Sequence, residues 1–197
     1  MMILDNIMEI EGQLFEFRPL ISEDWDSLEQ LFGKRGAMGG CWCMFWRQTP
    51  AEFNKMRGEP NRLEFKSLVE SGTVPGVLAY QGNEPAGWCA VEPRESYLRL
   101  RRAKVLAPID DQPVWSITCF YIGKQYRRKG LMRGLLNAAI DWAVSNGAHI
   151  IESYPFDTQQ GVRSSAAYTG VIPVYLQNGF VEVMRRAPRR PIMRKYL

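Results

Sequence analysis

The chain has 197 residues, of which 46% are hydrophobic and 23% charged, and its net charge at neutral pH is +4. This composition is typical of a globular protein, and the length predicts a single domain over 1–197. The small positive charge does not by itself favour a nucleic-acid partner, and no apolar run approaches the ~18 residues that a membrane span requires. The first residues, MMILDNIMEIEG, lack the basic start of a signal peptide, so we expect a cytoplasmic protein.

The first half of the chain carries signals for a strand, helices and a hairpin. Residues that often cap helices, Ser22, Thr49 and Asn61, precede apolar patterns of helical period. The segments GVLAY and AGWCAV are joined by QGNEP, which is typical of a β-hairpin. The predicted elements are a strand at 14–18, helices at 22–33, from 49 and at 61–71, and hairpin strands at 76–80 and 86–91.

The second half alternates strands and helices. The segment VWSITCFYI is rich in β-branched and aromatic residues, and a helical pattern follows Gly130 and ends at Asn146. We expect strands at 114–122, 148–154, 180–185 and 191–196, and a short helix that ends at 178. A strand, a helix and a strand in succession predict a parallel pair inside a mixed sheet, and hence an α/β fold. Two stretches without a clear element, 93–112 and 155–170, are long enough to favour functional loops.

Four cations surround Gly130 at the start of the predicted helix, namely Arg127, Arg128, Lys129 and Arg133. The helix dipole is already positive at this end, so the charges are unfavourable unless an anion binds. A helix start also offers backbone N–H groups without intrahelical partners, and glycine allows an anion to approach them closely. A solvated charged face is the ordinary alternative, but the position of the charges favours a phosphate site. The patterns GxxxxGK[ST] and GxGxxG are absent, which disfavours nucleoside triphosphate and dinucleotide folds.

The segment FYIGKQYRRKGLMRGLL resembles the acyl-coenzyme A signature of the GNAT superfamily of N-acetyltransferases, a strand and a short link before [RQ]xxGx[GA] at a helix start. Arg127, Gly130 and Met132 occupy the signature positions, and Met132 stands where the family usually has Gly or Ala. The segment VYLQNGF resembles a second family landmark, because Tyr175 lies four residues before Gly179. The order of elements also matches this family, which implies a central mixed, twisted sheet flanked by helices.

The resemblance implies acetyl-CoA as the acyl donor. Its pantetheine arm would pair with strand backbone as an added strand does, and its pyrophosphate would rest mainly on backbone N–H groups. It would enter a wedge between the strands that end at Ile122 and Tyr154. The implied donor-binding residues are Phe120, Tyr121 and Ile122 for the arm, and Arg127, Arg128, Lys129, Gly130, Leu131, Met132 and Arg133 for the pyrophosphate.

The resemblance also implies direct transfer of the acetyl group to an amine. Tyr175 would protonate the departing thiolate as general acid, although a buried core tyrosine is the ordinary alternative. A backbone N–H near Phe120 would polarise the thioester carbonyl. Glu152 is the first candidate for the base and Glu92 the second, with a water relay to either; a solvent-facing role for Glu152 is equally well supported. Tyr168 occupies the position where the family often carries an Asn.

The segment GGCWCMFWRQTP is the other unusual stretch, and it lies where this fold usually walls the acceptor site. We expect Trp42 and Trp46 to line an aromatic acceptor pocket with Arg47 at its rim. Cys41 and Cys43 are more typical of a buried helix start, with a redox or metal role as the alternative. The chain has no CxxC pair and a single histidine, so no metal site is predicted. RLRRAK, at 99–104, could contact an acidic acceptor or simply be a solvated loop.

These patterns together predict an acetyl-CoA-dependent N-acetyltransferase that acts on a primary amine of a small molecule or a peptide. We expect a monomer or a homodimer without a metal and without a membrane partner. Two alternatives stay open, a basic nucleic-acid-binding module and a non-catalytic relative that binds acyl-CoA. The departure at Met132 and the missing Asn keep the second alternative open.

Overall fold

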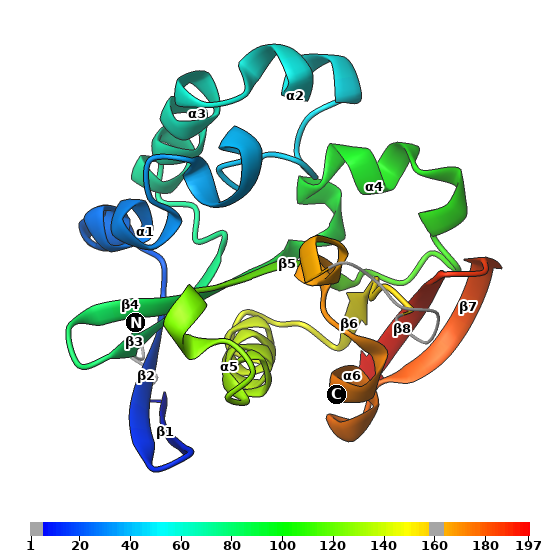
Figure 1. The fold of residues 1–197 in the computed structure, drawn as a ribbon. Coiled ribbons are helices and arrows are strands. Elements are labelled where there is room, and N and C mark those ends of the chain that lie inside the picture. Colours follow the sequence, from blue (N-terminus) through cyan, green and yellow to red (C-terminus); the bar gives the residue numbers. More distant parts are fainter. Residues whose placement is uncertain (1–5, 158–163) are drawn as a thin grey trace.

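A computed structural model of the chain describes residues 6–157 and 164–197. Within these residues the strands form one eight-stranded sheet in the order β1-β2-β3-β4-β5-β6-β8-β7 (Figure 1). The parallel pair is β5 and β6, and the other neighbouring pairs are antiparallel, which confirms the predicted mixed α/β sheet. The strands are β1 Asn6–Ile10, β2 Gln13–Pro19, β3 Gly76–Gln81, β4 Glu84–Pro93, β5 Trp115–Ile122, β6 Ile150–Ser153, β7 Val181–Ala187 and β8 Arg190–Tyr196.

Helices cover both faces of the sheet. In the view of Figure 1, α1 to α4 lie above the sheet and α5 lies below it. The helices are α1 Trp25–Phe32, α2 Pro50–Met56, α3 Glu59–Glu70, α4 Leu98–Arg102, α5 Leu131–Ser145 and α6 Ile172–Gln177. In the described residues, no helix has both the length and the apolar character needed to cross a membrane.

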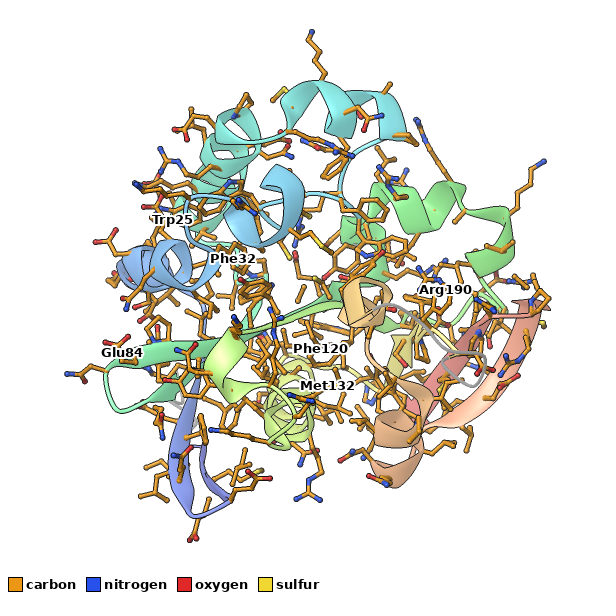
Figure 2. The ribbon with its side chains drawn as sticks, viewed as in Figure 1. Trp25, Phe32, Glu84, Phe120, Met132 and Arg190 are labelled. Atoms are coloured by element: carbon orange, nitrogen blue, oxygen red, sulfur yellow. The ribbon has the colours of Figure 1, made fainter. Side chains whose placement is uncertain are left out.

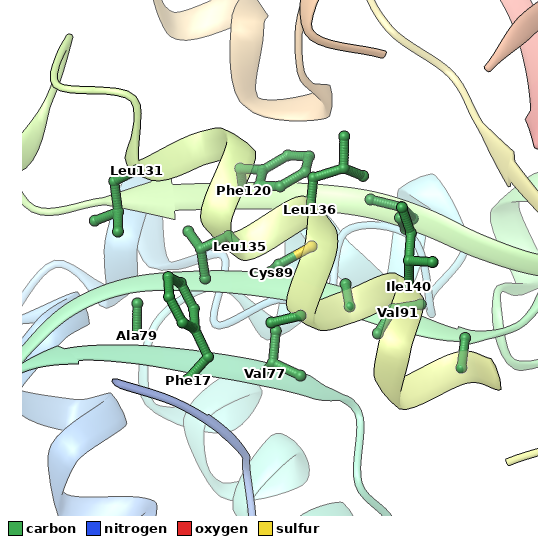
Figure 3. Close-up of a cluster of buried hydrophobic side chains, with 14 of the residues drawn as sticks. Phe17, Val77, Ala79, Cys89, Val91, Phe120, Leu131, Leu135, Leu136 and Ile140 are labelled. Atoms are coloured by element: carbon green, nitrogen blue, oxygen red, sulfur yellow. The ribbon is translucent and has the colours of Figure 1, made fainter. Parts of the chain in front are cut away.

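The alternation of side chains along β3 and β4 divides the core between the two faces. Val77 and Ala79 of β3 join the cluster under α5, whereas Leu78 and Tyr80 join the cluster under α1 and α3. Figure 3 shows the first cluster, in which Leu135 and other side chains of α5 pack on the strands. The centre of the sheet, formed by β3 and β4, is buried on both sides, and this explains why these strands are apolar on both faces.

One strand and one α-helix of the described residues were not predicted from the sequence. The strand β1 pairs with β2, and the turn that connects them consists of Glu11 and Gly12. Both residues have positive φ values, +51° and +74°. A two-residue turn with both φ values positive matches the right-handed twist of a hairpin. The helix α4 lies inside 93–112, where no element was expected, and buries Leu100. Part of the second irregular stretch, 158–163, lies outside the described residues.

Candidate active site

The strand β5 changes its neighbours halfway along its length. Residues 115–117 pair in parallel with 151–153 of β6. The ladder between β5 and β4 then skips Thr118, which makes a β-bulge. Residues 119–122 continue to pair with β4, but their other edge pairs with no strand in the part of the chain that the structure describes. The two strands therefore diverge after Ser153, as expected for the wedge.

A cavity of about 1250 Å³ opens along this unpaired edge. Phe120 of β5 and Met132 of α5, both labelled in Figure 2, contribute to its walls. The other walls come from the end of β1, the loop before α2, α2 itself and the region around α6. The cavity therefore runs from the start of α5 to the helices on the opposite face of the sheet.

Every residue that the family resemblance assigned to the acyl donor lines this cavity. These residues are Phe120, Tyr121, Ile122, Arg127, Arg128, Lys129, Gly130, Leu131, Met132 and Arg133. The unpaired strand edge and the basic turn thus belong to one continuous surface. Donor binding itself stays a prediction.

The basic turn presents the start of α5 to the cavity. Gly130 is the residue before the helix and has φ +83°, a left-handed conformation that glycine adopts without a steric penalty. The Arg133 amide donates to the Gly130 carbonyl at 2.9 Å, so the helical bonding begins there. Arg127 bends back and its Nε donates to the Ile122 carbonyl at 2.8 Å, which ties the turn to β5. The first turn of α5 contains no acidic residue.

Of the three predicted acceptor residues, the structure brings only Trp46 to the cavity. Trp42 lies under α1, where its ring stacks on that of Trp25 with centroids 6.2 Å apart. Arg47 is buried in an ion pair with Glu92 and is not part of the cavity wall. Trp42, Trp46 and Arg47 are close in the sequence, but the backbone turns sharply between them and directs their side chains into different parts of the structure.

Two aromatic residues that the sequence analysis did not single out, Phe45 and Phe53, join Trp46 and Tyr168 at this end of the cavity. The ring of Phe45 lies 5.2 Å from that of Trp46, 5.4 Å from that of Phe53 and 6.1 Å from that of Tyr168. All four line the cavity. The buried indole N–H of Trp46 has no hydrogen-bond partner among the residues that the structure describes. Phe45 could have been predicted to line the cavity because it is next to Trp46 in the sequence. No local pattern indicates such a position for Phe53.

Glu152 lies in a buried ionic cluster and is not part of the cavity lining. Its side chain is 1% exposed, and its carboxylate accepts hydrogen bonds from Arg94 at 2.7 Å, Tyr154 at 2.6 Å and Arg194 at 2.9 Å. The second candidate, Glu92, is paired with Arg47. Both carboxylates are engaged by arginines, so the structure gives neither a direct path to an amine in the cavity.

Tyr175 is fully buried behind Phe120, with ring centroids 6.4 Å apart. Its hydroxyl donates to the Thr169 carbonyl at 2.9 Å, and the residue does not line the cavity. Burial raises the pKa of the Tyr175 hydroxyl, so it stays protonated at neutral pH. The structure does not test the acid role that the resemblance implies for Tyr175, and this role would require the hydroxyl to leave Thr169.

Comparison with known proteins places these features in a family. Residues 39–170 match the model described as Acetyltransferase (GNAT) family. Among proteins with curated descriptions, none matches the chain. In the described residues no group of three or more His, Cys, Asp or Glu side chains is arranged to hold a metal ion.

Solved structures share the fold. An acetyltransferase of the GNAT family from Listeria monocytogenes is 12% identical over 98% of this chain and 100% of its own, with a TM-score of 0.60. The PaiA N-acetyltransferase from Thermoplasma acidophilum, solved in complex with coenzyme A, is 16% identical over 93% of this chain and 99% of its own, with a TM-score of 0.51. A GNAT acetyltransferase from Streptococcus pneumoniae has the same identity and coverage and a TM-score of 0.52. At these identities the likeness concerns the fold.

Proposed function

Since the chain belongs to the GNAT family of acetyltransferases, we propose that it transfers the acetyl group of acetyl-CoA to a primary amine of a small molecule or a peptide. The observation that carries the proposal is the cavity of about 1250 Å³, which joins the unpaired edge of β5 to the cationic start of α5. Coenzyme A has an extended arm and a polyanionic pyrophosphate. A free strand edge suits the arm, and a helix start with cations suits the pyrophosphate.

The arm would pair with the backbone of 120–122, and the pyrophosphate would accept hydrogen bonds from N–H groups of 128–133. This arrangement directs the thioester past Phe120 towards the aromatic end of the cavity. Phe45, Trp46 and Phe53 would then form the wall against which the acceptor packs. An acceptor with an apolar or aromatic body beside its amine suits such a wall.

The overall reaction needs a neutral amine and a polarised thioester. The amine nitrogen attacks the carbonyl carbon, a backbone N–H near Phe120 stabilises the oxygen, and the bond from carbon to sulfur breaks. Coenzyme A leaves as a thiolate, which takes its proton from water. Glu152 and Glu92 are both held in buried ion pairs. We therefore propose that water in the cavity, rather than a carboxylate in direct contact, carries away the proton of the amine.

Arg127→Ala is expected to weaken coenzyme A binding moderately at low salt and less at high salt. The side chain is exposed, and charges of this kind are screened within ~8–10 Å at 0.1–0.15 M salt. Isothermal titration at two salt concentrations measures the effect. A loss of affinity that is identical at both concentrations would instead assign Arg127 to packing, through its hydrogen bond to Ile122.

Tyr175→Phe separates a structural role from a catalytic one. The hydroxyl donates to a buried carbonyl, so we expect the free energy of unfolding to fall by ~0.5–1.5 kcal/mol. Because the residue does not line the cavity, kcat should stay within a few-fold of wild type. Urea unfolding and thiol release with an identified acceptor measure the two quantities. A fall in kcat of ~10²–10⁴-fold would identify Tyr175 as the acid.

The proposed function is tested by titrating the protein with coenzyme A and, separately, with duplex DNA at physiological salt. We expect binding of coenzyme A and none of DNA. A panel of amines and peptides, with release of free thiol from acetyl-CoA as the readout, then identifies the acceptor. Binding of DNA without coenzyme A would overturn the proposal in favour of a nucleic-acid module. Binding of coenzyme A without turnover of any amine would favour a non-catalytic acyl-CoA binder.

A further inference from the structure

In the described residues, three arginine side chains lie against the rings at the aromatic end of the cavity and are here called the wall arginines: Arg57, Arg99 and Arg190. The guanidinium carbon of Arg57 lies 5.0 Å from the centroid of the Phe53 ring. That of Arg99 lies 3.9 Å from the centroid of the Phe45 ring and 5.7 Å from that of Phe53. That of Arg190, which Figure 2 labels, lies 5.8 Å from the centroid of the Trp46 ring. All three rings line the cavity, so positive charge gathers at this wall.

Within the part of the chain that the structure describes, none of the wall arginines forms an ion pair. Arg190 donates hydrogen bonds to the Tyr154 carbonyl at 3.2 Å and to Thr169 Oγ1 at 3.1 Å, and neither acceptor is charged. Buried arginines elsewhere in the molecule have carboxylate partners, namely Arg47 with Glu92, Arg94 with Glu152, and Arg194 with Glu152 and Asp110. The described residues thus neutralise these structural arginines but not the wall arginines.

The carboxylates of the cavity lie at its other end. Among the described lining residues they are those of Glu9 and Glu11. Both flank Ile10, and a β-carbon on Gly130 would meet Ile10 Cγ2 at 3.4 Å, which places this hairpin beside the basic turn. A polyamine or a lysine-rich peptide carries several positive charges at neutral pH, and the wall arginines would repel it. The aromatic end instead suits an acceptor that carries an anionic group.

Arg57 is the wall arginine that is placed to contact an acceptor. The residue is exposed and lines the cavity, whereas Arg99 and Arg190 are not among the described lining residues. Arg57 directly follows α2, and the chain is anchored at this point because the Gly58 amide donates to the Gly40 carbonyl at 3.0 Å. The planar guanidinium presents N–H donors in a fork that matches the two oxygens of a carboxylate.

We propose that the acceptor carries a carboxylate as well as its amine, and that Arg57 binds this carboxylate. The proposal rests on the proposed function and names its acceptor class, an amino acid or a peptide with an acidic residue close to the reacting amine. The apolar body of such a molecule would pack on Phe45 and Trp46, and its amine would reach the thioester near Phe120. Arg99 and Arg190 would act on it through their charge.

The test offers acceptors in matched pairs that differ by a carboxylate or a carboxamide, with release of thiol from acetyl-CoA as the readout. The pairs are apolar α-amino acids, longer ω-amino acids, and peptides with aspartate or asparagine beside a free amino terminus. We expect at least one carboxylate to have a kcat/KM ~10-fold or more above that of its amide, and the pair that shows this distinguishes an amino acid from a peptide. Spermidine, the amides or an aminophosphonate turned over better than every carboxylate would overturn the proposal.

Arg57→Gln assigns the preference to one residue. The ratio of kcat/KM for the carboxylate to that for the amide should fall ~10-fold or more, while the value for the amide stays within a few-fold of wild type. Comparing this ratio between proteins cancels the different basicity of the two amines. Lys55→Gln is the matched control, because Lys55 is an exposed cation in the last turn of α2 outside the described lining, and it should keep the wild-type ratio. An unchanged ratio in folded Arg57→Gln, or an equal fall in both variants, would contradict the proposal.

Binding gives a readout that does not depend on turnover. Calorimetric titration of the coenzyme A complex should show tighter binding of the preferred carboxylate than of its amide. The difference should shrink at high salt, since Arg57 is exposed, and in Arg57→Gln. Coenzyme A itself should bind wild type and both variants alike. Coenzyme A binding with acetylation of amines irrespective of a carboxylate would leave the proposed function and refute only the acceptor class, whereas no coenzyme A binding would refute both.

Discussion

Gly130→Asp is expected to lower the affinity for coenzyme A by ~10²-fold or more. Gly130 lies at the start of α5 in the cavity wall, where the pyrophosphate is proposed to bind. A carboxylate at this position would repel the pyrophosphate and displace hydrogen bonds that contribute ~1.5–3 kcal/mol each when one partner is charged. Because ~1.4 kcal/mol corresponds to a tenfold change in affinity, the loss of two such bonds accounts for the expected effect.

Gly130→Asn is the matched control. Asparagine has nearly the shape of aspartate, carries no charge and also tolerates the left-handed conformation. A β-carbon at this position would meet Ile10 Cγ2 at 3.4 Å, an ordinary contact, so both variants should fold. Isothermal titration should show a much smaller loss for asparagine than for aspartate. Equal losses would indicate that bulk rather than charge is the cause, and unchanged affinity in folded Gly130→Asp would place the pyrophosphate elsewhere.

Glu152→Ala is expected to lower the free energy of unfolding by ~3–5 kcal/mol. Its carboxylate is the shared partner of Arg94 and Arg194, which are 5% and 2% exposed. Removing one member of a buried ionic cluster leaves the remaining charges without compensation, and this is the costly case. Arg194 retains Asp110 as a partner at 2.6 Å, so Arg94 bears most of the loss. Urea unfolding at neutral pH measures the change.

Glu152→Gln keeps the shape and part of the hydrogen bonding but removes the charge, so its stability loss should be smaller. At a temperature where this variant is folded, kcat should remain within a few-fold of wild type, because the carboxylate does not line the cavity. A stable Glu152→Gln variant with a large loss of kcat would return Glu152 to the role of base. The two variants together distinguish a structural carboxylate from a catalytic one.

Much of the fold could be predicted because its signals are local. The continuous apolar runs GVLAY and AGWCAV are typical of strands buried on both faces, and the QGNEP turn connects them as expected. The strand β1 was not predicted because it is a short edge strand that pairs with β2 alone in the described sheet, so tertiary pairing more than local pattern defines it. The helix α4 was missed because its few residues carry no cap, and it is held by contacts such as the burial of Leu100.

In the candidate site, too, local features could be predicted from the sequence and the packing of individual side chains could not. The basic turn was recognisable because glycine, cations and a helix start occur in adjacent positions. Trp42 and Trp46 look equivalent in the sequence, yet one packs under α1 and the other lines the cavity. Trp42 and Cys43 both have left-handed backbone conformations, which turn the chain between the two tryptophans, and the same loop is held against 58–61 by hydrogen bonds to the Gly40 carbonyl.

By itself, the sequence determined the strand and helix pattern around the basic turn and the cations that gather there, because periodicity and turn chemistry act over a few positions. Tertiary structure alone decided which side chains became partners. Arg94 and Glu152 are 58 positions apart, and Trp88 and Cys43 are 45 apart. No local pattern encodes such pairs, since they form only when the sheet brings β4, β6 and the loop before α2 together. Burial then gives these contacts their strength, by removing the charges and the thiol from water.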